Sequence, residues 1–196
     1  MKTVVTFLKR WLCPVLLGAG YVAILGGGTA CSTDPNDGHW IGDDVTHNDF
    51  ESVAGWGGAD RSTLTRDHAH SGRYAVAVDP SHETGLMFDL PLYEASVHSL
   101  AAIEVEAWVY LPNDKADARL QVELVADGPD PRATIHQEDL PLLSQVSEFK
   151  HWTQVHKIFQ LPSGQPGGSH LRLYLKRGSS TEPVYLDDIR VKAREW

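Results

Sequence analysis

Three segments of the sequence alternate apolar residues with polar and aromatic ones. In segment 103–110 the alternate residues are acidic or aromatic, and segments 120–126 and 171–176 add amide, acidic, basic and phenolic side chains. Aromatic rings pack against the apolar face of a sugar, while carboxylates, amides and guanidinium groups bond its hydroxyls. The pattern predicts a carbohydrate-binding surface made of Glu104, Glu106, Trp108, Tyr110, Gln121, Glu123, Arg172 and Tyr174. Ordinary cross-strand pairs and surface ion pairs are the alternative interpretation.

A second position with chemical potential is Asp187, which interrupts an apolar alternation. It shares the parity of Tyr185 and Ile189. A carboxylate on an apolar strand face needs a cation or several hydrogen-bond donors. Calcium, which takes six to eight oxygen ligands, would satisfy it. Backbone N–H groups, or a pair with Arg73 or Arg190, would do so equally.

Histidine is abundant, with ten residues in the chain. His68 and His70 are two apart and could chelate a transition metal from one face of a strand. Asp67 is the one acid close to them in sequence. We therefore predict a solvated turn at this position.

Signatures of catalysis are missing from the sequence. It contains no Gly-x-Ser-x-Gly, no His-Glu-x-x-His and no phosphate-binding glycine loop. Glu104, Glu106 and Glu123 could supply two carboxylates for glycoside hydrolysis. However, acidic residues are numerous and the sequence marks none of these as desolvated. We predict that the protein is not an enzyme.

Charge and cysteine content exclude further classes. The formal net charge is −9, and the basic residues Lys2, Lys9 and Arg10 all precede Cys31, so the remainder is more acidic still. An acidic surface repels phosphate backbones, which argues against nucleic-acid binding. The other cysteine, Cys13, lies in an apolar stretch near the N-terminus. The folded region therefore has neither an internal disulfide nor a cysteine-based zinc site.

The first 30 residues have the organisation of an export signal. A basic start is followed by the apolar run 11–25 and by small residues up to Ala30. Cys31 at the junction resembles the lipobox of bacterial lipoproteins, in which this cysteine is lipidated and becomes the first residue. Gly28 stands where lipoboxes usually carry a large aliphatic residue, and cleavage after Ala30 with a free Cys31 is the alternative. We expect an exported protein, lipid-anchored in the cell envelope or else secreted.

Beyond the leader, the periodicity of the sequence indicates strands. Residues 31–47 are polar and predict a tether, and residues 48–196 predict one antiparallel β-sandwich domain. One short helix is a candidate, at 93–101. The predicted strands are 48–52, 62–65, 73–79, 84–90, 102–111, 118–126, 152–161, 170–177 and 184–192.

Several stretches in order carry a family resemblance. They are Asn-Asp-Phe-Glu at 48–51 with Gly-Trp at 55–56, the run 70–78, Trp152, and Val-Tyr-Leu-Asp-Asp-Ile-Arg-Val at 184–191. Together they resemble the jelly-roll carbohydrate-binding modules of families 4, 9 and 22, which have the galactose-binding-like fold. The resemblance implies a non-catalytic module that binds a carbohydrate or glycoconjugate. It also implies a structural calcium ion held by Glu51 and Asp187. A surface lipoprotein that contacts another envelope protein and binds no sugar is the alternative.

Overall fold

The computed structural model describes residues 39–57 and 61–196. The signal peptide predicted at 1–30 and the lipidation predicted at Cys31 lie outside these residues. No helix in the described part of the chain is long and apolar enough to cross a membrane. The described elements are β1 (His39–Asn48), β2 (Leu64–Thr65), β3 (Ala75–Val78), β4 (Thr84–Pro91), α1 (Leu92–Ala95), β5 (Leu100–Tyr110), β6 (Ala118–Val125), β7 (Thr134–Pro141), β8 (Trp152–Gln160), β9 (His170–Arg177) and β10 (Val184–Glu195).

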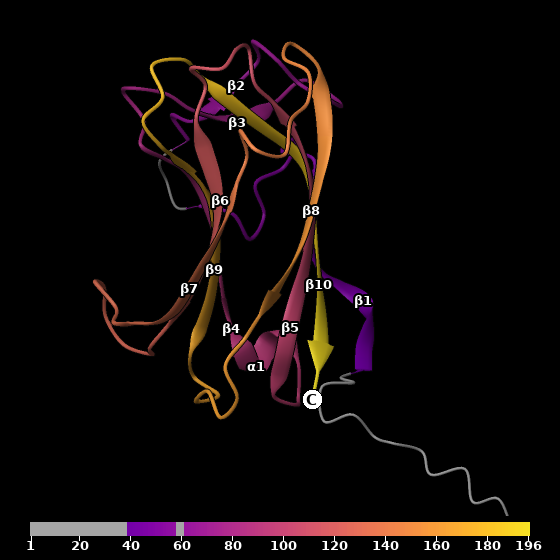
Figure 1. Ribbon diagram of the computed structural model, residues 1–196. Coiled ribbons are helices and arrows are strands. Elements are labelled where there is room, and N and C mark those ends of the chain that lie inside the picture. Colours follow the sequence, from indigo (N-terminus) through magenta and orange to yellow (C-terminus); the bar gives the residue numbers. More distant parts are fainter. Residues whose placement is uncertain (1–38, 58–60) are drawn as a thin grey trace, which may run out of the picture. The chain divides into compact units, whose positions relative to one another are not determined.

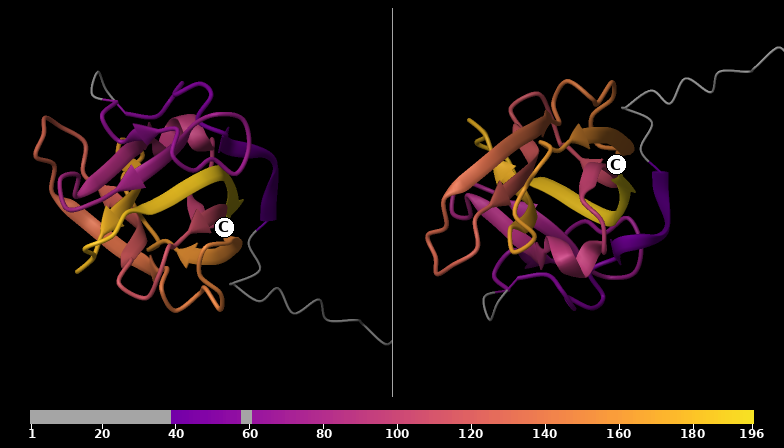
Figure 2. Two further views of the ribbon diagram at one scale, coloured as in Figure 1. Left: turned by 90° about the horizontal axis from the view of Figure 1, so that it is seen from above. Right: turned by 90° about the horizontal axis from the view of Figure 1, so that it is seen from below.

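The strands form two antiparallel sheets that pack face to face (Figures 1 and 2). Sheet A has the order β2-β3-β10-β5-β8, and sheet B has the order β4-β9-β6-β7. In sheet A, β3 and β1 share one edge of β10: β3 pairs with Val184 to Leu186, and β1 pairs with the part of β10 from Ile189 onward. The predicted all-β antiparallel sandwich is confirmed.

The core lies between the two sheets, as the alternation predicted. Ile103, Val105, Ala107 and Val109 of β5 are all buried, and so are the aliphatic residues that alternate along β6 and β9. A side chain on the inner face of either sheet loses almost all contact with water, which is the main stabilising contribution to such a fold. The intervening residues of these strands therefore lie on the two outer faces.

The sandwich begins earlier than predicted. Residues from His39 onward, placed in the tether by the sequence, form β1 and pair with β10, whereas the strand predicted at 48–52 contributes only Asn48, the last residue of β1. The polar run Gly42-Asp43-Asp44 interrupts the apolar alternation that would mark a strand. The pairing register with β10 also shifts here, between Trp40 and Asp44 and again between Asp44 and Thr46. Pairing with β10 and contact of Ile41 and Val45 with the core hold these residues in the sheet.

Two further elements differ from the prediction. Strand β7, one of the two edge strands of sheet B, carries a single buried residue, Leu140, so its sequence lacks the apolar alternation of a strand. The helix predicted at 93–101 is shorter in the structure, where α1 covers only Leu92–Ala95. Leu100, Ala101 and Ala102 are instead buried as the first residues of β5.

Candidate functional site

The eight residues predicted to bind carbohydrate do not form one surface. Glu104, Glu106, Trp108 and Tyr110 lie on the outer face of sheet A, on β5, whereas the four from β6 and β9 lie on the outer face of sheet B. Alternation shows which side of a strand faces the core. It does not show which sheet the strand joins, and a sandwich has two outer faces. The single platform that the pattern suggested is therefore divided into two.

On sheet A, the aromatic residues of β5 are covered by the segment 66–72. The ring of His70 stacks on Trp108, with centroids 4.0 Å apart and an interplanar angle of 14°. The ring of His68 stacks on Tyr110 at 4.4 Å and 19°. His68 and His70 are two apart, as are the two rings beneath them, so the segment matches the spacing of the strand. The sequence showed this spacing, but not that the histidines contact these rings.

Two adjacent carboxylates hold the segment 66–72 in place. Asp187 Oδ2 accepts hydrogen bonds from the backbone N–H groups of His70 and Ser71, at 2.7 and 3.1 Å, and its Oδ1 accepts from Asp188 N at 2.8 Å. Asp188 accepts from Ser71 Oγ at 2.8 Å and lies 2.5 Å from His70 Nδ1. Asp187 is buried, and this burial raises its pKa to about 6. The sequence left open whether Asp187 binds a cation or accepts hydrogen bonds, and in this structure it accepts hydrogen bonds from backbone N–H groups.

Glu51, the other residue implied for calcium, contacts the same stretch of chain. Its Oε1 accepts from Arg73 N at 2.5 Å and Tyr74 N at 2.9 Å, and its Oε2 accepts from Arg73 Nε at 3.2 Å. All four carboxylate oxygens of Glu51 and Asp187 thus accept at least one hydrogen bond each. Hydrogen bonds from Arg73 N and the Arg73 side chain, together with its charge, lower the pKa of Glu51 although desolvation opposes this.

The calcium prediction is open to a direct measurement. If Glu51 and Asp187 hold calcium, the wild-type protein should melt at a higher temperature in calcium than in chelator, because a bound ion stabilises the folded state that holds it. Glu51→Gln should remove that difference, and Asp79→Asn, at a carboxylate outside the pair, should retain it. Equal melting temperatures in calcium and in chelator would show that the N–H donors suffice.

The rest of the outer face of sheet A is a charged row. Glu104 Oε1 lies 2.7 Å from Nε2 of His156 on β8, and its Oε2 lies 3.7 Å from Lys192 Nζ on β10. Glu104, Glu106 and His156 form the one group of three or more acidic, histidine or cysteine residues in the described chain whose ligand atoms lie within 4.8 Å of one another. Glu123 is on the other sheet, so it pairs with neither glutamate for hydrolysis.

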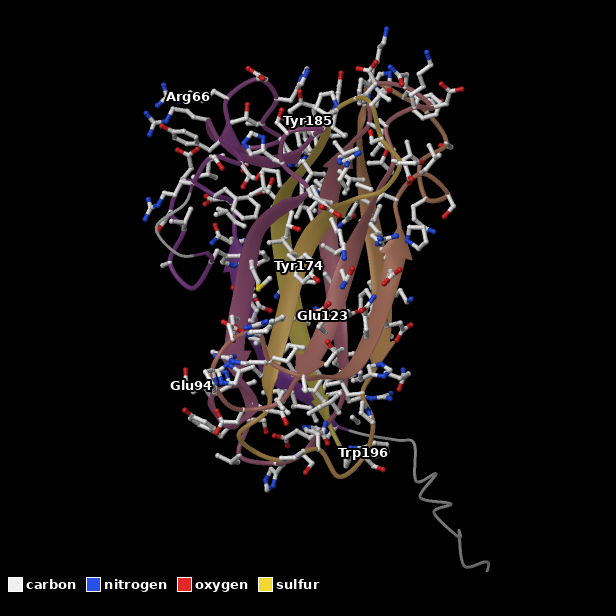
Figure 3. All side chains as sticks on the ribbon, turned by 90° about the vertical axis from the view of Figure 1, so that its left-hand side faces the viewer. Arg66, Glu94, Glu123, Tyr174, Tyr185 and Trp196 are labelled. Carbon is white, nitrogen blue, oxygen red and sulfur yellow. The ribbon has the colours of Figure 1, made fainter. Side chains whose placement is uncertain are left out.

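The outer face of sheet B carries a hydrogen-bonded triad at its centre, where Figure 3 shows Tyr174 and Glu123 side by side. The Tyr174 hydroxyl donates to Glu123 Oε1 at 2.7 Å, and Gln121 Nε2 donates to the Tyr174 oxygen at 2.6 Å and also to Glu123. Burial and the Glu123 carboxylate raise the pKa of Tyr174. Gln121 is 1% exposed, and its Oε1 has no hydrogen-bond partner. The triad thus holds a buried acceptor that is not satisfied.

An ion network adjoins the triad on the same face. Arg172 Nε donates to Asp89 Oδ2 at 2.9 Å and its Nη2 to Asp130 Oδ1 at 2.7 Å, while His170 Nδ1 lies 2.5 Å from Asp89 Oδ1. Arg132 also contacts Asp89, at 3.3 Å. This ties the loop between β6 and β7, which projects from sheet B in Figure 1, to β4 and β9. The sequence identified Arg172, but not its partners, because residues from three separate segments meet here.

Charge within this network fixes the protonation of its acids. Burial opposes ionisation of Asp89, but hydrogen bonds from His170 and Arg172 and the charges of Arg172 and Arg132 bring its pKa below the usual value. The hydrogen bond from Arg172 likewise lowers the pKa of Asp130. Both carboxyl groups are therefore ionised near neutral pH, and neither suits a general acid.

Comparison with known proteins gives a result at the level of fold. No protein-family model and no curated protein matches the sequence. The structure is similar to the N-terminal tandem of two family 22 carbohydrate-binding modules from Paenibacillus barcinonensis. The TM-score is 0.53 and the identity 16%, over 80% of this chain and 50% of that chain.

Two single modules match over nearly their whole length. A xylan-binding family 22 module from Paenibacillus barcinonensis has a TM-score of 0.49 and 19% identity, over 80% of this chain and 97% of its own. The C-terminal family 22 module of a Clostridium thermocellum protein has a TM-score of 0.49 and 15% identity, over 76% of this chain and 92% of its own. These comparisons show that the protein shares the β-sandwich fold of these carbohydrate-binding modules. They concern the fold alone.

Proposed function

We propose that this protein is a non-catalytic module that binds a glycan chain on the outer face of sheet B. The observation that carries the proposal is the triad of Gln121, Glu123 and Tyr174, in which hydrogen bonds from two buried side chains hold a partly exposed carboxylate, Glu123, in place. A carboxylate that is held in place and still reaches the surface can accept a further, charge-assisted hydrogen bond from a ligand hydroxyl. Glycans present many hydroxyls, each of which can both donate and accept.

The groups around the triad suit the same ligand. Glu123 offers a carboxylate as acceptor, Arg172 offers guanidinium N–H donors, and Met87, paired with Tyr174 across β4 and β9, offers an apolar surface to a sugar ring. Recognition here would depend on hydrogen bonds more than on stacked rings, because Tyr174 is 5% exposed. Glycoside hydrolysis needs a carboxylic acid that can donate a proton, and Asp89 and Asp130 are held ionised. Binding without catalysis is the function that this face supports.

The proposal predicts that Glu123→Gln weakens glycan binding by about tenfold or more, since a hydrogen bond to a charged group contributes roughly 1.5–3 kcal/mol. Retention of the full chain on a panel of polysaccharides, beginning with xylan, is the measurement. Xylan comes first because structurally similar modules bind it.

A matched control lies on the opposite face of the sandwich. Glu106→Gln makes the same change on the outer face of sheet A and should leave retention unchanged. Equal effects of the two substitutions, in variants that melt like wild type, would contradict the proposed face. A folded wild-type protein that no polysaccharide retains would contradict glycan binding itself.

We also propose that the protein is exported and lipid-anchored through Cys31. The support is the sequence alone: a basic start, an apolar run, small residues and then one cysteine. A surface lipoprotein that contacts an envelope protein instead of a glycan is the second candidate. It is favoured by the histidine cover over Trp108 and Tyr110, which removes the rings of sheet A as a sugar platform.

A further inference from the structure

Exposed apolar side chains gather at one end of the sandwich. Val97 is 91% exposed, Tyr93 63% and Trp196 50%, and these are three of the six large exposed apolar residues in the described chain. Tyr93 and Val97 line a pocket of about 170 Å³ beside α1, and Trp196 N donates to Ser99 O at 3.1 Å. We call Tyr93, Val97 and Trp196 the terminal apolar patch. Single exposed apolar residues are ordinary, but a group this exposed points to a contact.

The chain enters the sandwich at this same end. His39, the first residue of β1, pairs with Glu195, the last residue of β10, and Trp40 pairs with Arg194. Figure 1 shows α1, the C-terminus and the start of β1 together, and Figure 3 shows Trp196 and Glu94 at this end, far from Arg66 and Tyr185. Whatever precedes His39 in the sequence therefore connects to the domain beside the terminal apolar patch.

The distance to the predicted lipid anchor is short. Seven residues separate Cys31 from His39. Even fully extended, these eight steps span at most about 29 Å, at roughly 3.6 Å per residue. An acylated Cys31 lies at the membrane surface, so the end that carries the patch stays within that distance of the bilayer. The opposite end of the sandwich is separated from the end that carries the patch by the length of β5, which has 11 residues, so the tether does not hold it near the membrane.

We propose that the terminal apolar patch rests on the lipid surface and holds the sandwich upright on the membrane. The proposal rests on the lipid anchor proposed above. Tryptophan and tyrosine favour the boundary between headgroups and acyl chains, where an apolar ring is buried and its polar group stays wet. Glu94 lies beside the patch on α1, so attraction to anionic headgroups is not the source of the contact. A neutral bilayer should serve.

The test uses the chain from Cys31 onward, acylated on that cysteine, on phosphatidylcholine vesicles with and without bromine on the acyl chains near the headgroup. Bromine quenches a tryptophan that it approaches, and only vesicle-bound protein is measured. We expect brominated lipid to quench the fluorescence of the wild type more than that of Trp196→Phe. The difference between the two proteins reports Trp196, because the contributions of the other tryptophans cancel. The double variant Tyr93→Glu with Val97→Glu should lose most of that difference while it stays on the vesicles.

A matched substitution tests whether any exposed apolar residue would behave alike. Phe149 is 37% exposed at the opposite end, next to Lys150, whose N–H donates to Leu111 O just beyond β5. Phe149→Glu should leave the quenching unchanged. Equal quenching of the wild type and Trp196→Phe in bound protein would overturn the proposal.

The anchor has its own readout. Cys31→Ser should release the protein from vesicles, in agreement with lipidation. If the Cys31→Ser variant stays bound, the lipid anchor is wrong, whereas the quenching difference in bound protein still decides whether the patch contacts lipid.

Discussion

Replacement of Asp187 by alanine should lower the free energy of unfolding by about 3 kcal/mol, measured by urea denaturation. The carboxylate is buried and accepts hydrogen bonds from three backbone N–H groups, those of His70, Ser71 and Asp188. Alanine leaves these donors without a partner, and each buried donor so orphaned costs roughly 1–3 kcal/mol, less where water enters. The loss should be the same in calcium and in chelator if the N–H groups alone use this carboxylate.

The adjacent carboxylate provides the control. Asp188 contacts the side chains of Ser71 and His70 and is partly exposed, so water can replace it. Asp188→Asn, which tolerates the left-handed backbone of this residue (φ 45°), should therefore cost about 1 kcal/mol or less. Similar losses for the two substitutions would show that the backbone bonds to Asp187 do not dominate. The Trp108 fluorescence of the Asp187 variant should also change, because the His70 ring that covers it loses its support.

Trp56→Ala should be the most destabilising substitution considered, with a loss of about 4 kcal/mol in the free energy of unfolding. Trp56 is 1% exposed and lies between Phe50, at 5.4 Å edge-to-face, and Phe88, at 5.5 Å. Its Nε1 donates to Thr46 on β1, and its backbone bridges to Phe88 on β4. Alanine would leave a cavity at the point where the two sheets are joined along one side.

The same urea measurement distinguishes this role from that of another tryptophan. Trp56→Phe keeps most of the buried area, so its loss in the free energy of unfolding should be less than half of the loss for Trp56→Ala. Trp108→Ala removes a ring that stacks against His70 on an outer face, and it should cost about 1–2 kcal/mol. A larger loss for Trp108 than for Trp56 would contradict the assignment of Trp56 to the core.

The fold was predictable where a strand buries one face. The alternation along β5 and β9 identified both the strands and their core residues, because each inner side chain packs on the opposite sheet. It failed for β1 and β7. Strand β7 buries one residue, and β1 is held by its pairing with β10, which depends on residues more than 140 positions away. A local pattern does not contain such pairing.

The candidate site was predictable residue by residue but not as a surface. Tyr174, Glu123, Gln121 and Arg172 do meet, because they belong to neighbouring strands β6 and β9. Trp108 and Tyr110 follow the same alternation on the other sheet and are covered by His68 and His70. Asp89 and Arg132 went unnoticed, since Asp89 lies 43 positions from its partner Arg132 and 83 positions from its partner Arg172.

The pairing of β1 with β10 has a mechanical consequence. The two strands are antiparallel, and His39 lies at the end where the chain enters. A pull on His39 along β1 acts at right angles to the ladder of hydrogen bonds, so the bonds share the load in shear and do not open one after another. A domain anchored at one end, with a glycan held on sheet B, would transmit force through this ladder. Strand β1 would then act as the attachment that keeps the module folded when the surface it binds moves.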